Sequence, residues 1–363
     1  MNVAVLGAAG TIAPAVVRDL GESDEVESIL LLDLRGDVAA DVAAEHGGGK
    51  AEAREADARS GLAAHLDGVD ALVNSASYRI NIDAMRAALE AGCHYLDLGG
   101  LYHVTGEQLG LDGEFRDAGL LAVLGIGSSP GKTNLMAAGA VEALGRPPRE
   151  IQVLAAGRDL DPPPGLALPY SLETLIDELT MRPVVLRGGR AEEVEPLSSG
   201  GAYDFGEPIG AAETIHTLHS ELRTFGESFG CGECSFRLSL PPEALERLRG
   251  LAGASPEEVA SASREAVPQS AETVSVHAIE AIGEDRRVRA RCLTPPHRGW
   301  GLGGGIVSTA SPAAAAVRLL AREEVTARGA LPPERCLDSE AMFEQLRTRG
   351  CEFSVDVREG VAT

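Results

Sequence analysis

The first thirteen residues are the stretch that most constrains what this chain can fold into. An apolar run over residues 2–6 ends in Gly7, and a helical pattern opens at Ala13 after a second glycine, Gly10. This pattern predicts a strand, a tight turn at Gly7 and a helix start, with Gly10 leaving room for a pyrophosphate and Ala13 replacing a third glycine. Free N–H groups at a helix start attract phosphate. We therefore expect a dinucleotide to contact Gly7, Gly10, Thr11 and Ile12.

An acidic residue follows this turn at the spacing that dinucleotide binding requires. Twenty residues after Ala13, the apolar run 29–32 ends in Asp33, where a carboxylate binds both ribose hydroxyls of the adenosine half. The carboxylate would repel a 2′-phosphate, which favours NAD, whereas Arg35 would bind that phosphate if its side chain turned inward. NADP is therefore the alternative cofactor. The competing interpretation is a glycine turn in another α/β domain, with both residues as ordinary charges.

Short apolar strands alternate with helical segments through the first 130 residues. Strands are predicted at 2–6, 28–33, 51–56, 70–74, 94–98 and 121–126, and helices at 12–20, 38–45 and 82–91. This order is typical of a Rossmann fold, a doubly wound parallel sheet with right-handed crossovers, here of six strands. Ligands bind at the carboxyl ends of strands in such a sheet. We expect further cofactor contacts there, from Asp57, Asn74, Ser75, Ala76, Pro130 and Gly131.

The pattern changes after residue 150. Strands are predicted at 151–156, 234–240, 273–282 and 287–293, several with the two-residue alternation of half-exposed strands, and helices at 171–179 and 312–328. The sequence therefore predicts an α/β protein with three parts. They are a Rossmann domain (1–130), a mixed α/β domain for substrate binding and dimerisation (131–305), and a C-terminal helical segment (306–363) that packs back on the first domain.

Charge and hydropathy exclude several classes of partner. The chain has 55 acidic and 32 basic residues and a net charge of −23, so no basic stripe attracts nucleic acid or an anionic membrane. No apolar run reaches the roughly twenty residues of a membrane span, and the glycine turn begins too early for a signal peptide. We expect a cytoplasmic protein whose six scattered cysteines are free thiols.

Further motifs occur in an order and spacing that one family shares. They are Gly92-Cys-His-Tyr-Leu-Asp97-Leu-Gly-Gly, Gly125-Ile-Gly-Ser-Ser-Pro130-Gly131, Tyr170-Ser with Asp177-Glu178, Glu213-Thr with Leu222-Arg223-Thr224, and Gly329-Ala-Leu-Pro-Pro-Glu334. With them the chain resembles the saccharopine dehydrogenase-like family, and most of all its lysine 6-dehydrogenase and carboxynorspermidine dehydrogenase branch. The resemblance implies a homodimeric nicotinamide-dependent oxidoreductase that acts at a carbon–nitrogen bond of an amino acid or polyamine. Lys132-Thr133 and the histidine-rich stretch 213–221 depart from the family pattern.

Oxidation of an amine transfers a hydride to nicotinamide and needs a base for the ammonium proton. Asp97, just past a strand end, is the acidic candidate, and its alternative role is to bind loop amides. Tyr78 matches a tyrosine of saccharopine dehydrogenases that would hydrogen-bond near the nicotinamide, or is a wall residue. His216 and His219 share one face if they lie on a helix. Either is a general acid or base, His216 the stronger candidate, or a structural histidine.

Four residues are candidates for binding the charged ends of the substrate: Lys132, Glu213, Thr214 and Arg223. Arg223 would bind a carboxylate through a bidentate fork, and the alternative for the charged members is a solvated surface. The stretch 131–133 is no phosphate-binding P-loop, because the first glycine of that motif would fall at Ile126.

Cys231 and Cys234 have the spacing of half a zinc site that His216 and His219 would complete. The chain offers no second cysteine pair there, so we expect no metal. A redox-active pair has even less support.

Three functions fit these patterns. The first is an NAD(P)-dependent dehydrogenase or reductase of an amine or imine. The second is the reductive condensation of an amino acid with a keto acid, which requires a second substrate. The third is a Rossmann nucleotide sensor without catalysis. Fold alone does not distinguish them.

Overall fold

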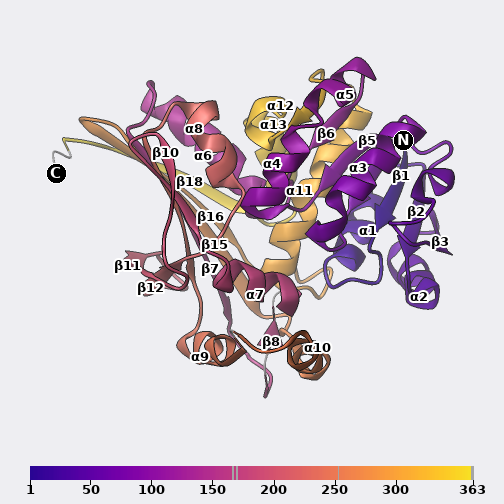
Figure 1. Cartoon of the computed structure of the whole chain (residues 1–363), viewed down its shortest axis with the longest axis horizontal. Helices are drawn as coiled ribbons and strands as arrows, with labels where there is room; N and C mark the ends of the chain where they lie inside the picture. Colours follow the sequence, from indigo (N-terminus) through magenta and orange to yellow (C-terminus); the bar gives the residue numbers. More distant parts are fainter. Residues whose placement is uncertain (166, 169–170, 252, 361–363) are drawn as a thin grey trace. The chain divides into compact units, whose positions relative to one another are not determined.

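The computed structural model describes residues 1–165, 167–168, 171–251 and 253–360, and the predicted motif residue Tyr170 lies outside them. The chain forms two compact units (Figure 1). Unit 1 comprises residues 1–135 and 309–346, and unit 2 comprises residues 136–308 and 347–363. The predicted α/β class, with a parallel doubly wound sheet and a second mixed domain, is confirmed.

Within the described ranges, unit 1 holds a seven-stranded parallel sheet in the order β17-β6-β5-β4-β1-β2-β3. The strands are β1 (Asn2–Leu6), β2 (Ser28–Asp33), β3 (Ala51–Glu55), β4 (Ala71–Asn74), β5 (His94–Asp97), β6 (Leu121–Val123) and β17 (Gly329–Leu331). The prediction of six strands was one short, because β17 is only three residues long and pairs with β6 across about 200 residues of chain. Such a short segment carries no recognisable periodicity.

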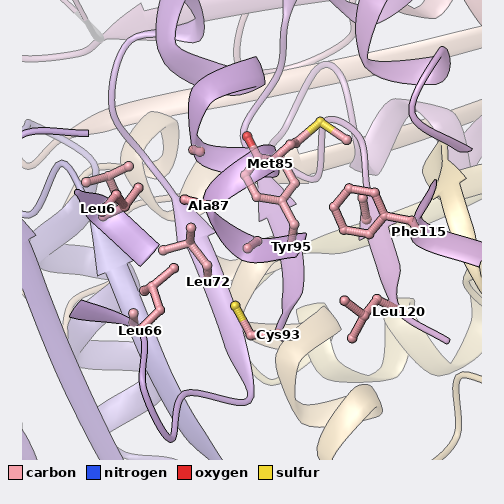
Figure 2. Packing of buried hydrophobic residues seen from close by; sticks show 14 of the residues in the cluster. Leu6, Leu66, Leu72, Met85, Ala87, Cys93, Tyr95, Phe115 and Leu120 are labelled. Carbon is pink, nitrogen blue, oxygen red and sulfur yellow. The ribbon is translucent and has the colours of Figure 1, made fainter. Parts of the chain in front are cut away.

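The helices of unit 1 follow its strands. They are α1 (Ala13–Gly21), α2 (Gly36–His46), α3 (Asn81–Ala91), α4 (Leu101–Leu109) and α5 (Asp112–Asp117), the short turns η1 (Leu62–His65) and η2 (Tyr78–Ile80), and α12 (Pro333–Cys336). A buried cluster beside the sheet joins strand residues Leu6, Leu72 and Tyr95 to helix residues Met85 and Phe115 (Figure 2). Burial of this apolar surface fixes the strands whose carboxyl ends carry the predicted site.

Unit 2 is built on a mixed sheet, nine-stranded in the part of the chain that the structure describes. Its strands are β7 (Glu150–Asp159), β9 (Val184–Arg187), β10 (Arg190–Glu193), β11 (Ser199–Asp204), β12 (Ala211–His216), β13 (Glu233–Ser239), β15 (Thr273–Ile282), β16 (Arg286–Thr294) and β18 (Glu352–Glu359). A small separate pair joins β8 (Ala167–Leu168) and β14 (Val267–Pro268). The helices of unit 2 are α7 (Leu172–Thr180), α8 (Glu221–Phe229), α9 (Pro242–Leu251) and α10 (Pro256–Glu265). Helix α13 (Ser339–Arg347) belongs to unit 1 except for its last residue.

Arginines of the sheet hold the β11–β12 hairpin through its backbone carbonyls. Arg237 donates to the carbonyl of Gly200 at 2.6 Å, and Arg291 donates to that of Phe205 at 2.7 Å. Each guanidinium thereby provides a hydrogen-bond donor for a backbone carbonyl of the hairpin that would otherwise depend on water. The hairpin packs on an apolar cluster of the sheet that includes Leu154 and Val276.

Helices α6 (Lys132–Leu144) and α11 (Gly304–Ala321) each contain residues of both units. The predicted helix at 312–328 was misplaced, since α11 begins eight residues earlier and contains Pro312 in its interior. A Cβ at Gly304 would lie 2.0 Å from the Thr294 carbonyl oxygen, so glycine is required by close packing at this helix start.

The C-terminal segment also differs from the helical prediction for 306–363. Residues 352–359 form β18, which pairs antiparallel with β16 at the edge of the second sheet. The alternation of Phe353, Val355 and Val357 with polar residues is the local signal for this strand.

By length and composition, α11 is apolar enough to span a membrane, and 78% of it is buried inside the protein. A core helix of a folded domain has the same properties.

Candidate functional site

Gly7 makes the turn between β1 and α1 and brings it against the loop after β4. Its φ is +79°, a left-handed conformation, and a Cβ at this position would lie 2.6 Å from the backbone of Ala76. The Gly7 amide donates to the Leu32 carbonyl at 2.8 Å, and the Gly10 amide donates to the Gly7 carbonyl at 2.9 Å. Only glycine combines this φ with this approach. The predicted turn is therefore observed at the predicted residue.

Asp33 and Arg35 lie against the same glycine turn. The Asp33 carboxylate accepts the Ala9 amide at 3.0 Å and the Arg35 amide at 2.9 Å. The Arg35 guanidinium donates to the Ala9 carbonyl at 2.6 Å, and its Nε lies 3.7 Å from Asp33. The Asp33 side chain is 12% exposed. The two residues expected to distinguish NAD from NADP thus lie against one loop.

Asp97 is buried at the end of β5 and binds two neighbouring loops. Its Oδ1 accepts the amides of Gly99 at 2.9 Å and Gly125 at 2.8 Å. Its Oδ2 accepts the side-chain amides of Gln108 and, at 3.3 Å, Asn81. Burial raises the pKa of Asp97 to about 6, because these donors only partly offset the lost hydration. The predicted catalytic carboxyl is therefore placed among protein donors rather than on the surface of the loops.

Asn74, predicted to contact the cofactor, is equally enclosed. Its amide donates to Asn81 Oδ1 at 2.9 Å and to the Tyr95 hydroxyl at 3.2 Å, and its Oδ1 accepts the Ala76 amide at 3.1 Å. Ser75, beside it, donates to the Leu6 carbonyl at 2.8 Å. The side chains of Asn74 and Ser75 therefore shape the loop after β4, and its backbone is what a ligand would meet.

Pro130 and Gly131 pack tightly against the loops after β5 and β6. A Cβ at Gly125 would lie 2.6 Å from the Pro130 ring, and one at Gly131, with φ +119°, would lie 2.3 Å from a carbonyl oxygen. The Gly131 amide donates to Asn134 Oδ1 at 2.8 Å, and Asn134 donates to Glu334 at 2.7 Å. Lys132 follows, fully buried at the start of α6.

Two more predicted residues of unit 1 lie after strand ends. Tyr78 is buried in η2, with the Arg79 guanidinium 4.8 Å from its ring centroid. Asp57 is exposed in a turn after β3, where it accepts the Arg59 amide at 2.9 Å. Thr11 is exposed beside the glycine turn, and Ile12 is buried just before α1.

His216 and His219 do not share a helix face, which corrects the prediction. His216 ends β12, paired with Arg237, and His219 lies in the loop before α8, which begins only at Glu221. Strand pairing with β13 continues through His216 and excludes a helix there. Burial and the Arg237 charge lower the pKa of His216, so the imidazole is neutral. Its Nδ1 is buried without a hydrogen-bond partner among the residues that the structure describes.

His219 lies in a buried acidic pair within unit 2. Its ring nitrogens are 3.8 Å from Glu178 and 3.5 Å from Glu221, and its ring stacks on Phe236 with centroids 3.5 Å apart. Burial opposes protonation, but the two carboxylates outweigh it and raise the pKa of His219 above its ordinary 6.5. The folded protein therefore favours the imidazolium, which balances buried negative charge.

The free energy of unfolding should consequently fall as pH rises above 6.5. A pKa raised by folding contributes stability that is complete below the unfolded value and is lost as pH passes the folded value. Denaturant unfolding of wild type and His219→Gln between pH 6 and 9 measures this, and the difference between them should shrink with pH. His103→Gln, at an exposed position, is the control. A difference independent of pH would contradict the assignment.

The predicted substrate-binding residues of unit 2 lie on different elements. Glu213 is exposed on β12, and Arg223 is exposed on α8. Thr214 is buried and donates to the Gly201 carbonyl at 2.7 Å. Cys231 and Cys234 are buried free thiols. Among the residues that the structure describes, no three histidine, cysteine, aspartate or glutamate side chains gather to hold a metal.

Sequence reasoning missed Asn81 and Gln108, which connect Asn74 to Asp97. Neither has a local signature, because an amide inside a helix is ordinarily a solvated surface residue. No helix was predicted at 101–109, so Gln108 was not assigned to an element at all.

Known proteins resemble this chain in two ways, one through its N-terminal part and one over nearly its whole length. Residues 3–123 match the family described as the saccharopine dehydrogenase NADP binding domain. Apo saccharopine dehydrogenase (L-Glu forming) from Saccharomyces cerevisiae has a similar structure over 98% of this chain and 99% of that chain, with 15% identity and a TM-score of 0.71. At this identity the likeness shows the fold alone. A myo-inositol dehydrogenase from Corynebacterium glutamicum matches over 96% of this chain and 94% of that chain, with 12% identity and a TM-score of 0.45. That structural similarity is too low to assign even the fold.

Proposed function

Because this chain belongs to the saccharopine dehydrogenase-like family through its N-terminal domain, we propose that it is an NAD(P)-dependent oxidoreductase acting at a carbon–nitrogen bond of an amino acid or polyamine. One observation carries the proposal. The glycine turn after β1 and the Asp33 carboxylate after β2 meet at the carboxyl edge of a parallel sheet. Strands β1–β6 follow the order in which dinucleotide-binding sheets reverse direction between β1 and β4.

The cofactor lies across that reversal in our proposal. The adenosine half occupies the loops after β1–β3, with Asp33 on its ribose, and the nicotinamide half occupies the loops after β4–β6. The nicotinamide supplies the hydride acceptor when bound. The chain supplies phosphate contacts at the start of α1 and a rigid floor of loops under the reacting ring.

We propose NAD as the preferred cofactor, because Asp33 presents a carboxylate where NADP carries its 2′-phosphate. Arg35 donates to the Ala9 carbonyl and lies near Asp33, which supports this preference. Asp33→Ala should weaken NADH binding about 10–100-fold, the loss of charge-assisted hydrogen bonds to the ribose, and NADPH binding less.

Fluorescence titration of NADH and NADPH measures both affinities. Asp41→Ala, an exposed carboxylate on α2, should change neither. Tighter NADPH than NADH binding in the wild type, lost in Arg35→Ala, would instead assign the cofactor as NADP.

Tyr78 and Lys132 are our candidates at the reacting end. Tyr78 follows β4, at the strand-order reversal, and Lys132 opens the helix after β6. Lys132 is fully buried at that helix start, and we propose that its ammonium helps to bind the carboxylate of the substrate. Alanine variants of Tyr78 and Lys132 should retain NADH binding and lose turnover.

Absorbance at 340 nm with L-lysine, diamines and saccharopine, each with NAD and NADP, tests the reaction. Reduction of the cofactor by one amine would support the proposal. Turnover only when an amino acid and a keto acid are both present with NADH would show the condensation reaction. Nucleotide binding without turnover across the panel would favour the sensor. We further propose that the protein acts in the cytoplasm as a homodimer, which the family resemblance supports.

A further inference from the structure

A continuous set of buried side chains connects the three loops on the nicotinamide side of the sheet in unit 1. Asn74 at the end of β4 holds the Ala76 amide and donates to Asn81. Asn81 at the start of α3 donates to Asp97 at the end of β5, and Asp97 accepts the Gly125 amide after β6. One hydrogen-bonded chain therefore runs from the loop after β4, through that after β5, to that after β6.

This chain lies beneath the loops rather than on them. Asn74, Asn81 and Asp97 are each 1% exposed and Gln108 is fully buried, so none reaches a ligand bound above the strand ends. Asn81 also donates to the Gly99 carbonyl at 3.1 Å, while Asp97 accepts the Gly99 amide. Gly99 is thus held at both its N–H and its C=O.

The direction of the hydrogen bonds among these side chains requires Asp97 to accept at both of its oxygens. Loop amides donate to Oδ1, and the side-chain amides of Gln108 and Asn81 donate to Oδ2. The pKa of about 6 leaves the carboxyl ionised at neutral pH, and an anionic acceptor makes stronger hydrogen bonds than a neutral one. A group occupied in this way is suited to fixing backbone and not to exchanging protons with a substrate.

We propose that Asp97 is a positioning residue, which through Asn81 and Gln108 locks the loops after β4, β5 and β6 into one rigid floor for the nicotinamide half of the cofactor. This inference rests on the proposed dinucleotide function. It replaces the catalytic role that the sequence indicated for Asp97. The requirement at position 97 is a pattern of acceptors, not an ionisable proton.

Two variants separate these requirements. In Asp97→Asn, one oxygen still accepts the loop amides, but the new NH2 faces the donors of Gln108 and Asn81. In the double variant Asp97→Asn/Gln108→Glu, the NH2 faces a carboxylate that accepts it, so the contact between positions 97 and 108 is restored with the acidic group moved. The Asn81 amide keeps the Gly99 carbonyl and the oxygen of residue 108 as acceptors. Gln108→Met removes the side-chain amide that donates to Asp97 and accepts from Asn81 but leaves the Asp97 carboxylate in place, so it is the milder variant if Asp97→Asn does not fold.

Titration with NADH and with ADP-ribose, which lacks the nicotinamide, measures how much the loops contribute to binding of the nicotinamide half. We expect Asp97→Asn to weaken NADH binding roughly tenfold, the effect of about one charge-assisted hydrogen bond, and to leave ADP-ribose within about twofold. Gln108→Met should act in the same direction, and the double variant should recover most of the NADH affinity. Equal losses for the two ligands, or no recovery in the double variant, would overturn the proposal.

Amide hydrogen exchange in the ligand-free protein tests the same floor without a cofactor. Protection at Gly99 and Gly125 should fall in Asp97→Asn or Gln108→Met and return in the double variant. Unchanged protection would overturn the inference. Suppose that the protection pattern is as expected but the wild type binds neither NADH, NADPH nor ADP-ribose. The proposed dinucleotide function then fails, and with it the role of these loops as a floor for the nicotinamide. The hydrogen-bonded connection between the loops would still stand.

Discussion

Replacing Arg318 with methionine is expected to lower the free energy of unfolding by about 3–5 kcal/mol, the effect of removing one member of a buried ion pair. Arg318 lies in α11 and donates to Asp19 of α1 at 2.7 Å within unit 1, and their side chains are 4% and 0% exposed. Removing the guanidinium leaves a carboxylate that burial keeps from water. Urea unfolding followed by circular dichroism gives the change.

Two comparisons make the result specific. Asp19→Leu/Arg318→Met removes both charges and should recover most of the loss, because an apolar pair of similar volume suits the same space. Arg322→Met breaks the more exposed pair with Glu25, whose side chains are 38% and 23% exposed, and should cost less than about 1 kcal/mol. If Arg318→Met lowers the free energy of unfolding no more than Arg322→Met does, then burial does not make the Asp19–Arg318 ion pair important for stability.

Replacing Gly7 with alanine should weaken dinucleotide binding about 100-fold or more, equivalent to about 3 kcal/mol. The alanine meets two obstacles. A φ of +79° costs a residue with a Cβ about 1–2 kcal/mol, and the Cβ would overlap the backbone of Ala76 at 2.6 Å. Relief of that overlap displaces the turn that carries the phosphate contacts. NADH titration and thermal unfolding of the same sample separate lost binding from lost folding.

Gly49 offers a control with the same backbone angle. Its φ is also +79°, but a Cβ there would have open space around it. Gly49→Ala should therefore show the conformational cost alone, as a small loss of stability with unchanged NADH affinity. Similar behaviour of the two variants would mean that the approach of the β1 turn to the loop after β4 does not matter for binding.

The features that could be predicted from the sequence are those encoded by neighbouring residues. The turn at Gly7, the strands β1 and β2 and the place of Asp33 follow from a motif within about 30 residues, and each was found where expected. The long strands β15 and β16 were equally visible, because their alternation is a local pattern.

The features that escaped prediction depend on partners far away in the chain. Strand β17 is defined by its pairing with β6 about 200 residues earlier. At the start of α11, Gly304 packs so closely on the Thr294 carbonyl that a Cβ would not fit. A shared helix face was considered for His216 and His219, because spacing alone does not show that β13 pairs with His216. Asp97 was recognised as a buried loop carboxylate, but its partners Asn81 and Gln108 have no signature of their own.

The division of unit 1 into residues 1–135 and 309–346 has a consequence for how this protein is made. As the chain leaves the ribosome, the first 135 residues emerge with the β6 edge unpaired and Asp19 without its arginine, which follows 299 residues later. An open strand edge and an unbalanced buried charge both disfavour early completion of the fold. Synthesis of unit 1 therefore starts with the first strand but is complete only at residue 346, so a nascent chain or an N-terminal fragment would depend on chaperones until the later helices of this unit are translated.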